Sequence, residues 1–200
     1  MDIRNPDLTR QQILDAAFCE IHRSGFQAAS IANILSNTGL TKGALYHHFP
    51  TKQALGLAVI DEVVADLLDA LIFRELRESA QPVESLLEII DGIDQKFSAD
   101  MIKLGCPLNN LMQEMSPLDE MFKNRLNAVL TTWQGVIEDA LKRGQAQGVI
   151  RVDVDCKAAA LFIVSAWEGC GGIAKNFQSP ETFSLCMKQL HGYVEGLTTR

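Results

Sequence analysis

The stretch Ser30–Lys52 constrains the fold more strongly than any other part of the chain. Ile31, Ile34 and Leu35 lie on one face of a short helix at helical spacing. The segment Asn37–Gly39 ends that helix, because glycine permits the left-handed conformation that a sharp turn requires. A second short helix follows directly, so the stretch predicts two helices joined by a tight turn.

The second helix is expected over Thr41–Phe49, with Thr41 as its N-cap. Leu45 and Phe49 are four residues apart and should be buried on the same face. The other positions then face outward, and they are Lys42, Gly43, Ala44, Tyr46, His47 and His48. In a helix-turn-helix motif the second helix enters the major groove of DNA. An ordinary helical hairpin with a solvated outer face would fit the same pattern.

The residues of the second helix add a family resemblance. The segment TKGALYHHFPTKQAL resembles the recognition-helix segment of the TetR family of bacterial repressors, and LTRQQILDAAFCEIHRSGF is similar to the family's first helix. The matching positions are Thr41, Lys42, Gly43, Leu45, Tyr46, His48, Phe49 and Lys52. The resemblance covers about the first quarter of the chain. Beyond it, only the length and the helical character agree.

This resemblance implies DNA-contacting residues. The side chains expected to face the groove or its walls are those of Thr41, Lys42, Tyr46, His47 and His48, together with the backbone of Gly43. Ser30 and Lys52 would hold phosphates. Lys42 and His47 are the expected base-edge contacts, supported by DNA shape.

The whole chain has the pattern of helices, so we expect an all-α fold. Residues 1–52 would form a three-helix helix-turn-helix DNA-binding domain, and residues 53–200 a helical ligand-binding and dimerisation domain. The expected helices span about Thr9–Arg23 and Lys52–Ala80, with further starts at Pro82, Pro107, Pro117, Asp155 (as a cap) and Pro180.

The charge is distributed unevenly along the chain. Residues 1–52 carry five Lys or Arg against four Asp or Glu, whereas the 200-residue chain has a formal net charge of −7. DNA would repel the acidic remainder and so orient the N-terminal segment towards itself. The cations that could meet phosphates are Arg4, Arg10, Lys42 and Lys52. We expect modest non-specific affinity.

The five cysteines are odd in number and form no Cys-x-x-Cys pair. This favours reduced thiols in the cytoplasm and argues against a disulfide framework and a structural zinc site. The N-terminus is polar and predicts no signal peptide. The apolar segment Ala158–Trp167 is too short to span a bilayer, so we expect no membrane partner.

The last two predicted helices suggest a homodimer. Phe183, Met187, Leu190 and Val194 follow the 4-3-4 spacing of a narrow apolar seam. The preceding helix is apolar nearly all round and includes Phe162. These helices could form a two-fold interface, or they could complete a monomeric core. A dimer would place two recognition helices about 34–36 Å apart on a palindromic site.

Cys106 is a candidate sensor of oxidants or electrophiles. It lies at a helix start, where backbone N–H groups and the helix dipole would lower the pKa of its thiol. Lys175 is a possible partner that would favour the thiolate. The Gly-Cys step resembles a subgroup of TetR-like repressors that includes electrophile-responsive members. A free cysteine is more often a small buried hydrophobe, so this alternative stays open.

A non-covalent effector pocket is the other possibility. Residues that could line it are Phe97, Met101, Met112, Trp133 and Trp167, among other methionine and aromatic side chains. Ordinary helical core positions would have the same composition. An effector must favour a conformation in which the two DNA-binding heads no longer match the operator.

We therefore expect a cytoplasmic, homodimeric transcriptional repressor that a small molecule or cysteine modification releases from double-stranded DNA. A helical adaptor that binds only proteins is the alternative. Catalysis is disfavoured, because the four histidines form no metal-ligand motif and the chain has no phosphate loop. No cofactor is expected.

Overall fold

The computed structural model describes residues 6–36 and 38–199, and it divides the chain into two compact units. Unit 1 comprises Met1–Asp66 and Asn110–Asn127, and unit 2 comprises Leu67–Asn109 and Ala128–Arg200. The predicted division at residue 52 therefore differs from the observed one. The reason is that the helix beginning at Lys52 packs against the first helix, so the N-terminal unit continues past it.

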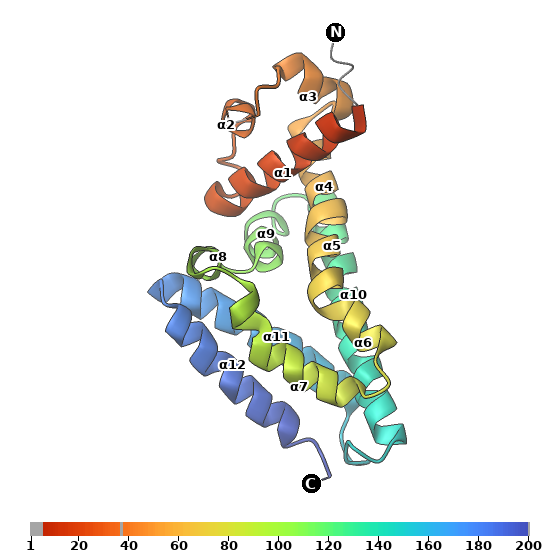
Figure 1. The fold of residues 1–200 in the computed structure, drawn as a ribbon. Coiled ribbons are helices and arrows are strands. Elements are labelled where there is room, and N and C mark those ends of the chain that lie inside the picture. Colours follow the sequence, from red (N-terminus) through yellow and green to blue (C-terminus); the bar gives the residue numbers. More distant parts are fainter. Residues whose placement is uncertain (1–5, 37, 200) are drawn as a thin grey trace. The chain divides into compact units, whose positions relative to one another are not determined.

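Unit 1 begins with the helices α1 (Pro6–Ser24), α2 (Ile31–Leu35) and α3 (Lys42–His48) (Figure 1). Helix α1 packs against both α2 and α3. The side chains at the centre of this packing have no exposed surface, and they include Ile13, Leu14, Ala17 and Leu45. Burying these side chains stabilises above all the short helices α2 and α3, which would be marginal in isolation.

The predicted helix-turn-helix is confirmed. The Ser30 hydroxyl accepts a hydrogen bond from the Asn33 N–H at 3.0 Å and caps α2. The Thr41 hydroxyl accepts from the Ala44 N–H at 3.2 Å and caps α3. Gly39, in the turn, has a φ of +66°, the left-handed conformation that glycine adopts without strain. Asn37 lies outside the described residues.

The predicted long helix from Lys52 is present but contains two π-helical stretches. Its segments are α4 (Lys52–Ala58), η1 (Val59–Val64), α5 (Ala65–Leu68), η2 (Asp69–Phe73) and α6 (Arg74–Glu78). The chain passes from unit 1 to unit 2 within α5. Short π-helical stretches are uncommon and often occur at functional sites.

Two further helices also pass from one unit to the other. They are α9 (Pro107–Met115) and α10 (Glu120–Ala146). Helix α10 begins three residues after the predicted start at Pro117. The Asp119 carboxylate explains this boundary, because it accepts hydrogen bonds from the N–H groups of Met121 and Phe122 at 2.8 and 3.2 Å.

Unit 1 is closed by an aromatic contact. The rings of Phe26 and Phe122 have centroids 4.5 Å apart. Gly56 makes this approach possible, since a Cβ atom at that position would lie 2.5 Å from Cε2 of Phe26 and 2.7 Å from Cζ of Phe122. The close packing therefore requires glycine on α4.

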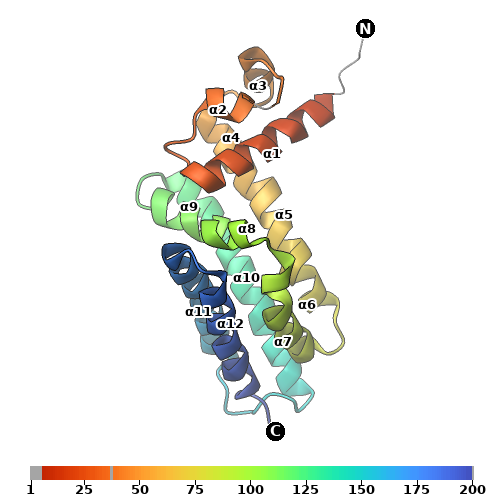
Figure 2. The ribbon, with the colours of Figure 1, turned by 60° about the vertical axis from the view of Figure 1, so that its left-hand side comes forward.

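Unit 2 contains the remaining helices, which are α7 (Pro82–Gly92), η3 (Ile93–Lys96), α8 (Ala99–Leu104), α11 (Cys156–Phe177) and α12 (Pro180–Glu195). Helix α12 packs against both α7 and α11, and Figure 2 shows it beside α11. Asp155 caps α11 as predicted, and its carboxylate accepts from the N–H groups of Lys157 and Ala158.

The predicted role of the α12 seam in dimerisation is wrong. Phe183, Met187, Leu190 and Val194 are all buried inside the single chain. Their apolar face packs within unit 2, against α7 and α11, so these side chains are not available to a second copy. The spacing identified an apolar helix face correctly but could not say which helix covers it.

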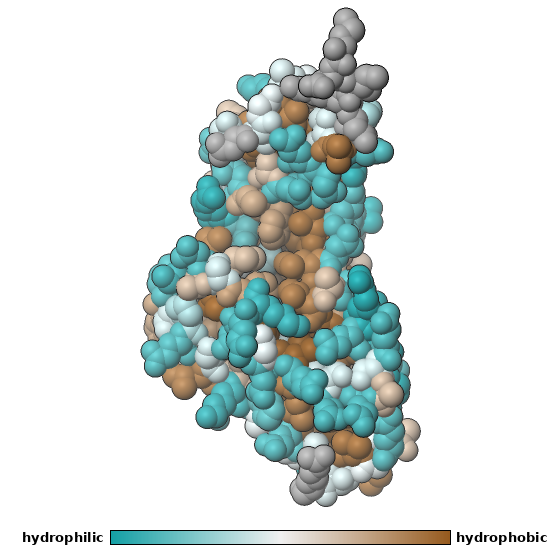
Figure 3. All heavy atoms as spheres, viewed as in Figure 1, coloured by the Kyte–Doolittle hydropathy of each residue, from teal (hydrophilic) through white to brown (hydrophobic). Residues whose placement is uncertain are grey.

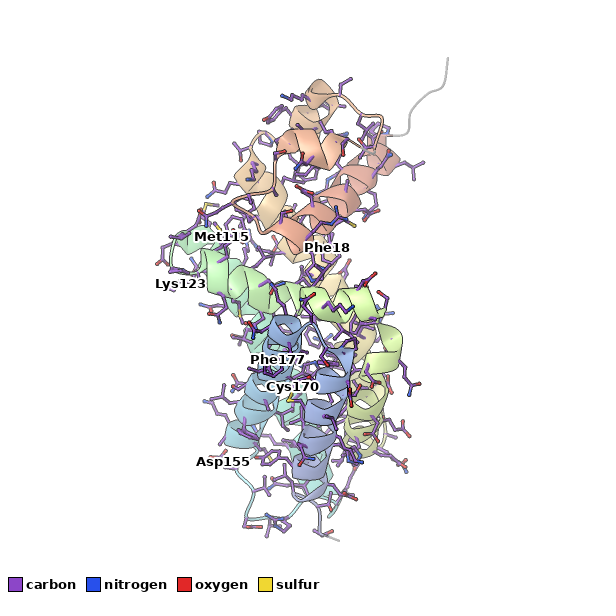
Figure 4. The ribbon with its side chains drawn as sticks, turned by 90° about the vertical axis from the view of Figure 1, so that its left-hand side faces the viewer. Phe18, Met115, Lys123, Asp155, Cys170 and Phe177 are labelled. Atoms are coloured by element: carbon purple, nitrogen blue, oxygen red, sulfur yellow. A yellow bond between two sulfur atoms is a disulfide. The ribbon has the colours of Figure 1, made fainter. Side chains whose placement is uncertain are left out.

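The expectation that the thiols are all reduced is also corrected. Cys170 of α11 and Cys186 of α12 form a disulfide, with Cα atoms 5.5 Å apart (Figure 4). The two cysteines come together because α11 packs along α12. Cys19, Cys106 and Cys156 are free.

Helix α11 is long and apolar enough to cross a membrane by length and composition alone. An 18-residue window of it has a mean hydropathy of 1.2. Half of that window is nevertheless buried inside the protein, as in the core helix of a globular domain. The criterion is therefore weak evidence for a membrane span.

Candidate nucleic-acid interface and sensor site

The outward face of α3 is polar and exposed. Lys42 and His47 are exposed, and Tyr46 has 46% of its surface exposed. Leu45 and Phe49 hold the helix from below, with 0% and 3% exposed. On the face shown in Figure 3, the part formed by α1–α3 is predominantly hydrophilic, with isolated hydrophobic residues. Lys42 and Tyr46 are thus free to meet a ligand without disturbing the core.

The start of α3 leaves room for a close approach. Thr41 is exposed, and a Cβ atom at Gly43 would meet only the Thr41 hydroxyl, at 3.8 Å. The absence of a side chain at Gly43 therefore serves no packing need of the unit. A bare backbone on an outward face instead lets a partner come close to the helix.

The groove residue His48 and the predicted phosphate contacts Ser30 and Lys52 are less open. Ser30 and His48 are half-buried. The Lys52 ammonium donates to the main-chain oxygen of Gln27 at 3.0 Å and lies 4.8 Å from the centroid of the Phe26 ring. It retains donors for a phosphate, since a lysine ammonium carries three, but its position is fixed by these internal contacts.

Of the other cations expected near DNA, Arg10 is already paired. Its guanidinium makes two hydrogen bonds to the Glu62 carboxylate, at 2.5 and 2.6 Å, which lowers the pKa of that carboxyl. Arg10 also stacks over the ring of Phe49 at 5.1 Å. Arg4 lies outside the described residues.

No local sequence pattern predicts the carboxylate that binds the end of α1. The Glu114 carboxylate accepts hydrogen bonds from the backbone N–H groups of Phe26 and Gln27, both at 2.8 Å. The chain turns there through Gly25, whose φ is +82°. Glu114 belongs to α9, far away in the sequence, and no local pattern links the two segments.

The predicted low pKa of Cys106 is wrong. Burial and the neighbouring Glu168 carboxylate raise the pKa of the Cys106 thiol well above its usual value, although the backbone N–H groups of Asn109 and Leu108 act in the opposite direction. The thiol donates a hydrogen bond to Glu168 Oε1 at 3.2 Å. The helix start is present as expected, but desolvation outweighs its effect.

Glu168 is the functional candidate that sequence reasoning missed. It is 6% exposed on α11, and burial raises the pKa of its carboxyl to about 7. Lys175, the predicted partner of Cys106, is exposed in the last turn of α11. The available signal was a single carboxylate within an otherwise apolar helix, since such a residue is rarely buried without a reason.

The predicted effector residues do not form one group. Trp133 and Trp167 are buried, and their rings meet edge to face with centroids 5.6 Å apart. Phe97 and Met101 are half-buried in unit 2. Met112 is half-buried in unit 1, whereas the other four predicted residues belong to unit 2. Within residues 6–36 and 38–199, no group of three His, Cys, Asp or Glu side chains could hold a metal ion.

The fold and the α3 surface together define a helix-turn-helix DNA-binding regulator, and comparisons with known proteins identify its family. Residues 13–59 match the model of bacterial regulatory proteins of the tetR family, and residues 82–190 match the tetracyclin repressor-like C-terminal domain. The second match covers more than half of the chain. The protein belongs to the TetR family of transcriptional regulators.

Similar proteins support the same conclusion. An uncharacterised HTH-type regulator in the lacX 3′ region of Lactococcus lactis is 33% identical over 141 residues, which is 70% of this chain and 72% of that protein. The repressor DhaR of a Mycobacterium species is 25% identical over 160 residues, covering 80% and 79%. A TetR-family regulator from Agrobacterium tumefaciens superposes with a TM-score of 0.84 at 25% identity, covering 98% of this chain and all of that one.

Proposed function

We propose that the protein is a cytoplasmic, homodimeric repressor that inserts α3 of each copy into the major groove of a palindromic operator. The observation that supports this proposal is that α3 has one buried and one exposed face. Leu45 is buried, with Phe49 at the C-cap, and the exposed face bears Lys42, Tyr46 and His47. Lysine and tyrosine supply phosphate contacts, and His47 with Lys42 can reach base edges.

The dimer would form through the outer faces of α11 and α12. Five large apolar side chains there each have half or more of their surface exposed, namely Leu161, Phe162, Ile173, Phe177 and Leu185. The ring of Phe162 also contacts that of Tyr193 in a tilted arrangement, with centroids 4.6 Å apart, which joins the two helices into one surface. An apolar patch of this kind on a soluble chain marks an interaction site. Of the predicted dimer residues, Phe162 alone contributes to it.

A non-covalent effector suits unit 2 better than a reactive thiol does. Only the thiolate is a good nucleophile, and the raised pKa keeps Cys106 protonated at neutral pH. The electrophile hypothesis can be tested with N-ethylmaleimide and mass spectrometry. We expect exposed Cys19 to be modified well before Cys106. Faster modification of Cys106 than of Cys19 would instead support the hypothesis that Cys106 is a reactive sensor.

Helix α9 offers a route by which an effector could act on the DNA-binding residues. In unit 2 the Asn109 amide donates to the main-chain oxygen of Glu168 at 3.1 Å, and in unit 1 Glu114 binds the end of α1. One nine-residue helix therefore supplies a contact to each unit. An effector that binds one conformation of α9 better than another would shift the population of molecules whose DNA-binding residues can engage the operator.

The decisive experiment uses the DNA that flanks the gene. We expect the protein to bind a fragment of it as a dimer, with a clearly negative slope of log K against log salt concentration, because binding releases counterions. Size-exclusion chromatography with light scattering checks the dimer, and Phe162→Asp should shift it to monomer. Dimers that show no salt-dependent DNA binding would favour the adaptor.

A further inference from the structure

The interior of unit 2 contains a carboxylate oxygen that has no partner. Glu168 is buried, with 6% of its surface exposed. One of its oxygens, Oε1, accepts the hydrogen bond from Cys106, whereas Oε2 is buried without any hydrogen bond in the described structure. Leaving such an acceptor unsatisfied costs about 1–3 kcal/mol. Native proteins rarely keep such a group unless something binds it.

The surroundings of Glu168 are held firmly in place. Cys106 lies next to the first turn of α9, and the N–H groups of Leu108 and Asn109 are directed at its sulfur. The Asn109 side chain in turn donates to the main-chain oxygen of Glu168. On α11, Gly171 presents no side chain to Cys106, whose backbone nitrogen is 3.8 Å from where a Cβ atom would be. The unpartnered oxygen therefore belongs to a carboxylate whose neighbours are held in place by hydrogen bonds and close packing.

Two buried indole rings lie in the same unit as this carboxylate. Trp167 precedes Glu168 in the chain, and its ring meets that of Trp133. Trp133 is 1% exposed, and its indole Nε1 is also buried without a hydrogen-bond partner. The interior of unit 2 thus combines an unpartnered acceptor, an unpartnered donor and a pair of indole rings. Indole faces attract cations as well as apolar groups.

The chemistry of these groups selects one class of ligand. The ionised form of the Glu168 carboxylate would repel an anion, and a purely apolar molecule would leave Oε2 unsatisfied. A protonated amine supplies both an N–H donor and the opposite charge. We propose that unit 2 binds a small organic ammonium ion with an aromatic or apolar body, whose N–H group donates to Glu168 Oε2. The role of this ion as the effector rests on the proposed function, whereas its binding does not.

Benzylamine is a suitable first probe, and benzyl alcohol is its uncharged counterpart of similar shape. Trp133 and Trp167 are the two tryptophans of the chain, so intrinsic fluorescence reports on the interior of unit 2. We expect saturable binding of benzylamine at neutral pH, at least tenfold tighter than that of benzyl alcohol. Equal affinity for the two probes, or no saturable binding of benzylamine, would overturn the proposal and leave water as the natural occupant.

Variants separate the ion pair from general packing. Glu168→Gln keeps the shape of the side chain but removes the charge, and it should abolish the preference for benzylamine. Glu181→Gln, at an exposed position on α12, is the matched control and should keep the preference. If Glu168→Gln does not fold, Glu168→Asp provides the second test, since it keeps the charge but withdraws the carboxylate. A preference retained in Glu168→Gln would contradict the proposal.

The measurement uses no DNA, so its outcome is independent of the repressor hypothesis. Benzylamine that binds through Glu168 but does not release the flanking DNA would leave the ammonium site intact and exclude this ion as the effector. DNA binding without benzylamine binding would leave the repressor hypothesis intact and overturn the ammonium site.

Discussion

The two units differ in how completely their polar groups are satisfied. In unit 1 the hydroxyls of Ser30 and Thr41 cap helices, and the Glu114 carboxylate accepts two backbone hydrogen bonds. Among the described residues, the buried side-chain atoms that have no hydrogen-bond partner all lie in unit 2, and they are Asp94 Oδ1, Trp133 Nε1 and Glu168 Oε2.

Under the proposed function, this difference corresponds to two kinds of recognition. A DNA-reading surface must present a fixed set of side chains, so its supporting polar groups bind one another and its recognition residues face outward. A ligand sensor must be stabilised when its ligand binds, so its interior retains polar groups whose hydrogen bonds only a ligand supplies. Local capping patterns therefore predict the first kind of site, while the second emerges only from tertiary packing.

The largest expected effect concerns the exposed face of α3. Replacing both Lys42 and Tyr46 by alanine should weaken binding to the flanking DNA at least a thousandfold, about 4 kcal/mol, because each dimer loses four contacts. Loss of the lysine should also reduce the salt slope by about 1 per protomer. Circular dichroism should show an unchanged fold, since both side chains are exposed.

Lys96→Ala is a suitable control, because Lys96 is exposed in η3 of unit 2, outside the proposed dimer faces of α11 and α12. It should bind the same DNA as the wild type does. A double variant with wild-type affinity would show that α3 is not the recognition helix. It would also contradict the assignment of DNA recognition to the exposed face of unit 1.

The second prediction concerns pH. The pKa of Glu168 is about 7 in the folded chain, against an ordinary value of 4.5, so folding favours the protonated carboxyl. Its contribution is complete below pH 4.5 and is lost as the pH rises through 7. It amounts to about 3 kcal/mol at most. Denaturant unfolding at pH 5 and pH 8 measures it.

Glu168→Gln isolates this contribution from other titrating groups. The free energy of unfolding of the variant, relative to the wild type, should increase between pH 5 and pH 8, whereas Glu181→Gln should follow the wild type throughout. If the difference in the free energy of unfolding between Glu168→Gln and the wild type does not change with pH, burial does not raise the pKa of the Glu168 carboxyl.

The parts of the structure that could be predicted from sequence are those that depend on neighbours in the chain. The caps at Thr41 and Asp155, the turn glycine Gly39 and the buried pair Leu45 and Phe49 all follow from spacings of a few residues. Together they predicted the helix-turn-helix and the outward face of α3. The resemblance to the TetR family rested on the same short stretch.

The errors concern contacts between distant segments. Which helix covers the α12 seam, whether Cys170 meets Cys186, and what surrounds Cys106 depend on packing that no local pattern encodes. For Cys106 the helix start was placed correctly, yet its electrostatic effect is outweighed by burial beside Glu168, which lies 62 residues further along the chain.

The third prediction tests whether unit 1 depends on the Glu114 brace. Glu114→Ala removes the acceptor of two backbone N–H groups, at Phe26 and Gln27, and should lower the free energy of unfolding by about 2 kcal/mol. Glu120→Ala is the control, because its exposed pair with Lys123 contributes less than about 0.5 kcal/mol. Equal losses in the two variants would mean that the brace does not stabilise the unit.

The smallest expected effect separates stability from recognition. Gly43 on α3 and Gly135 on α10 are both exposed and helical, and a Cβ atom meets only the Thr41 hydroxyl, at 3.8 Å, at the first and nothing within 4 Å at the second. Alanine at either position should therefore raise the free energy of unfolding by about 0.5–1 kcal/mol, because it restricts the unfolded chain.

Only Gly43→Ala should weaken DNA binding, by about fivefold or 1 kcal/mol, since the added methyl group separates α3 from the groove. Gly135→Ala should leave DNA affinity unchanged, because Gly135 belongs to unit 2. The pair thus distinguishes a glycine that serves recognition from one that serves neither folding nor binding. Wild-type DNA affinity in Gly43→Ala would place the groove against another part of unit 1.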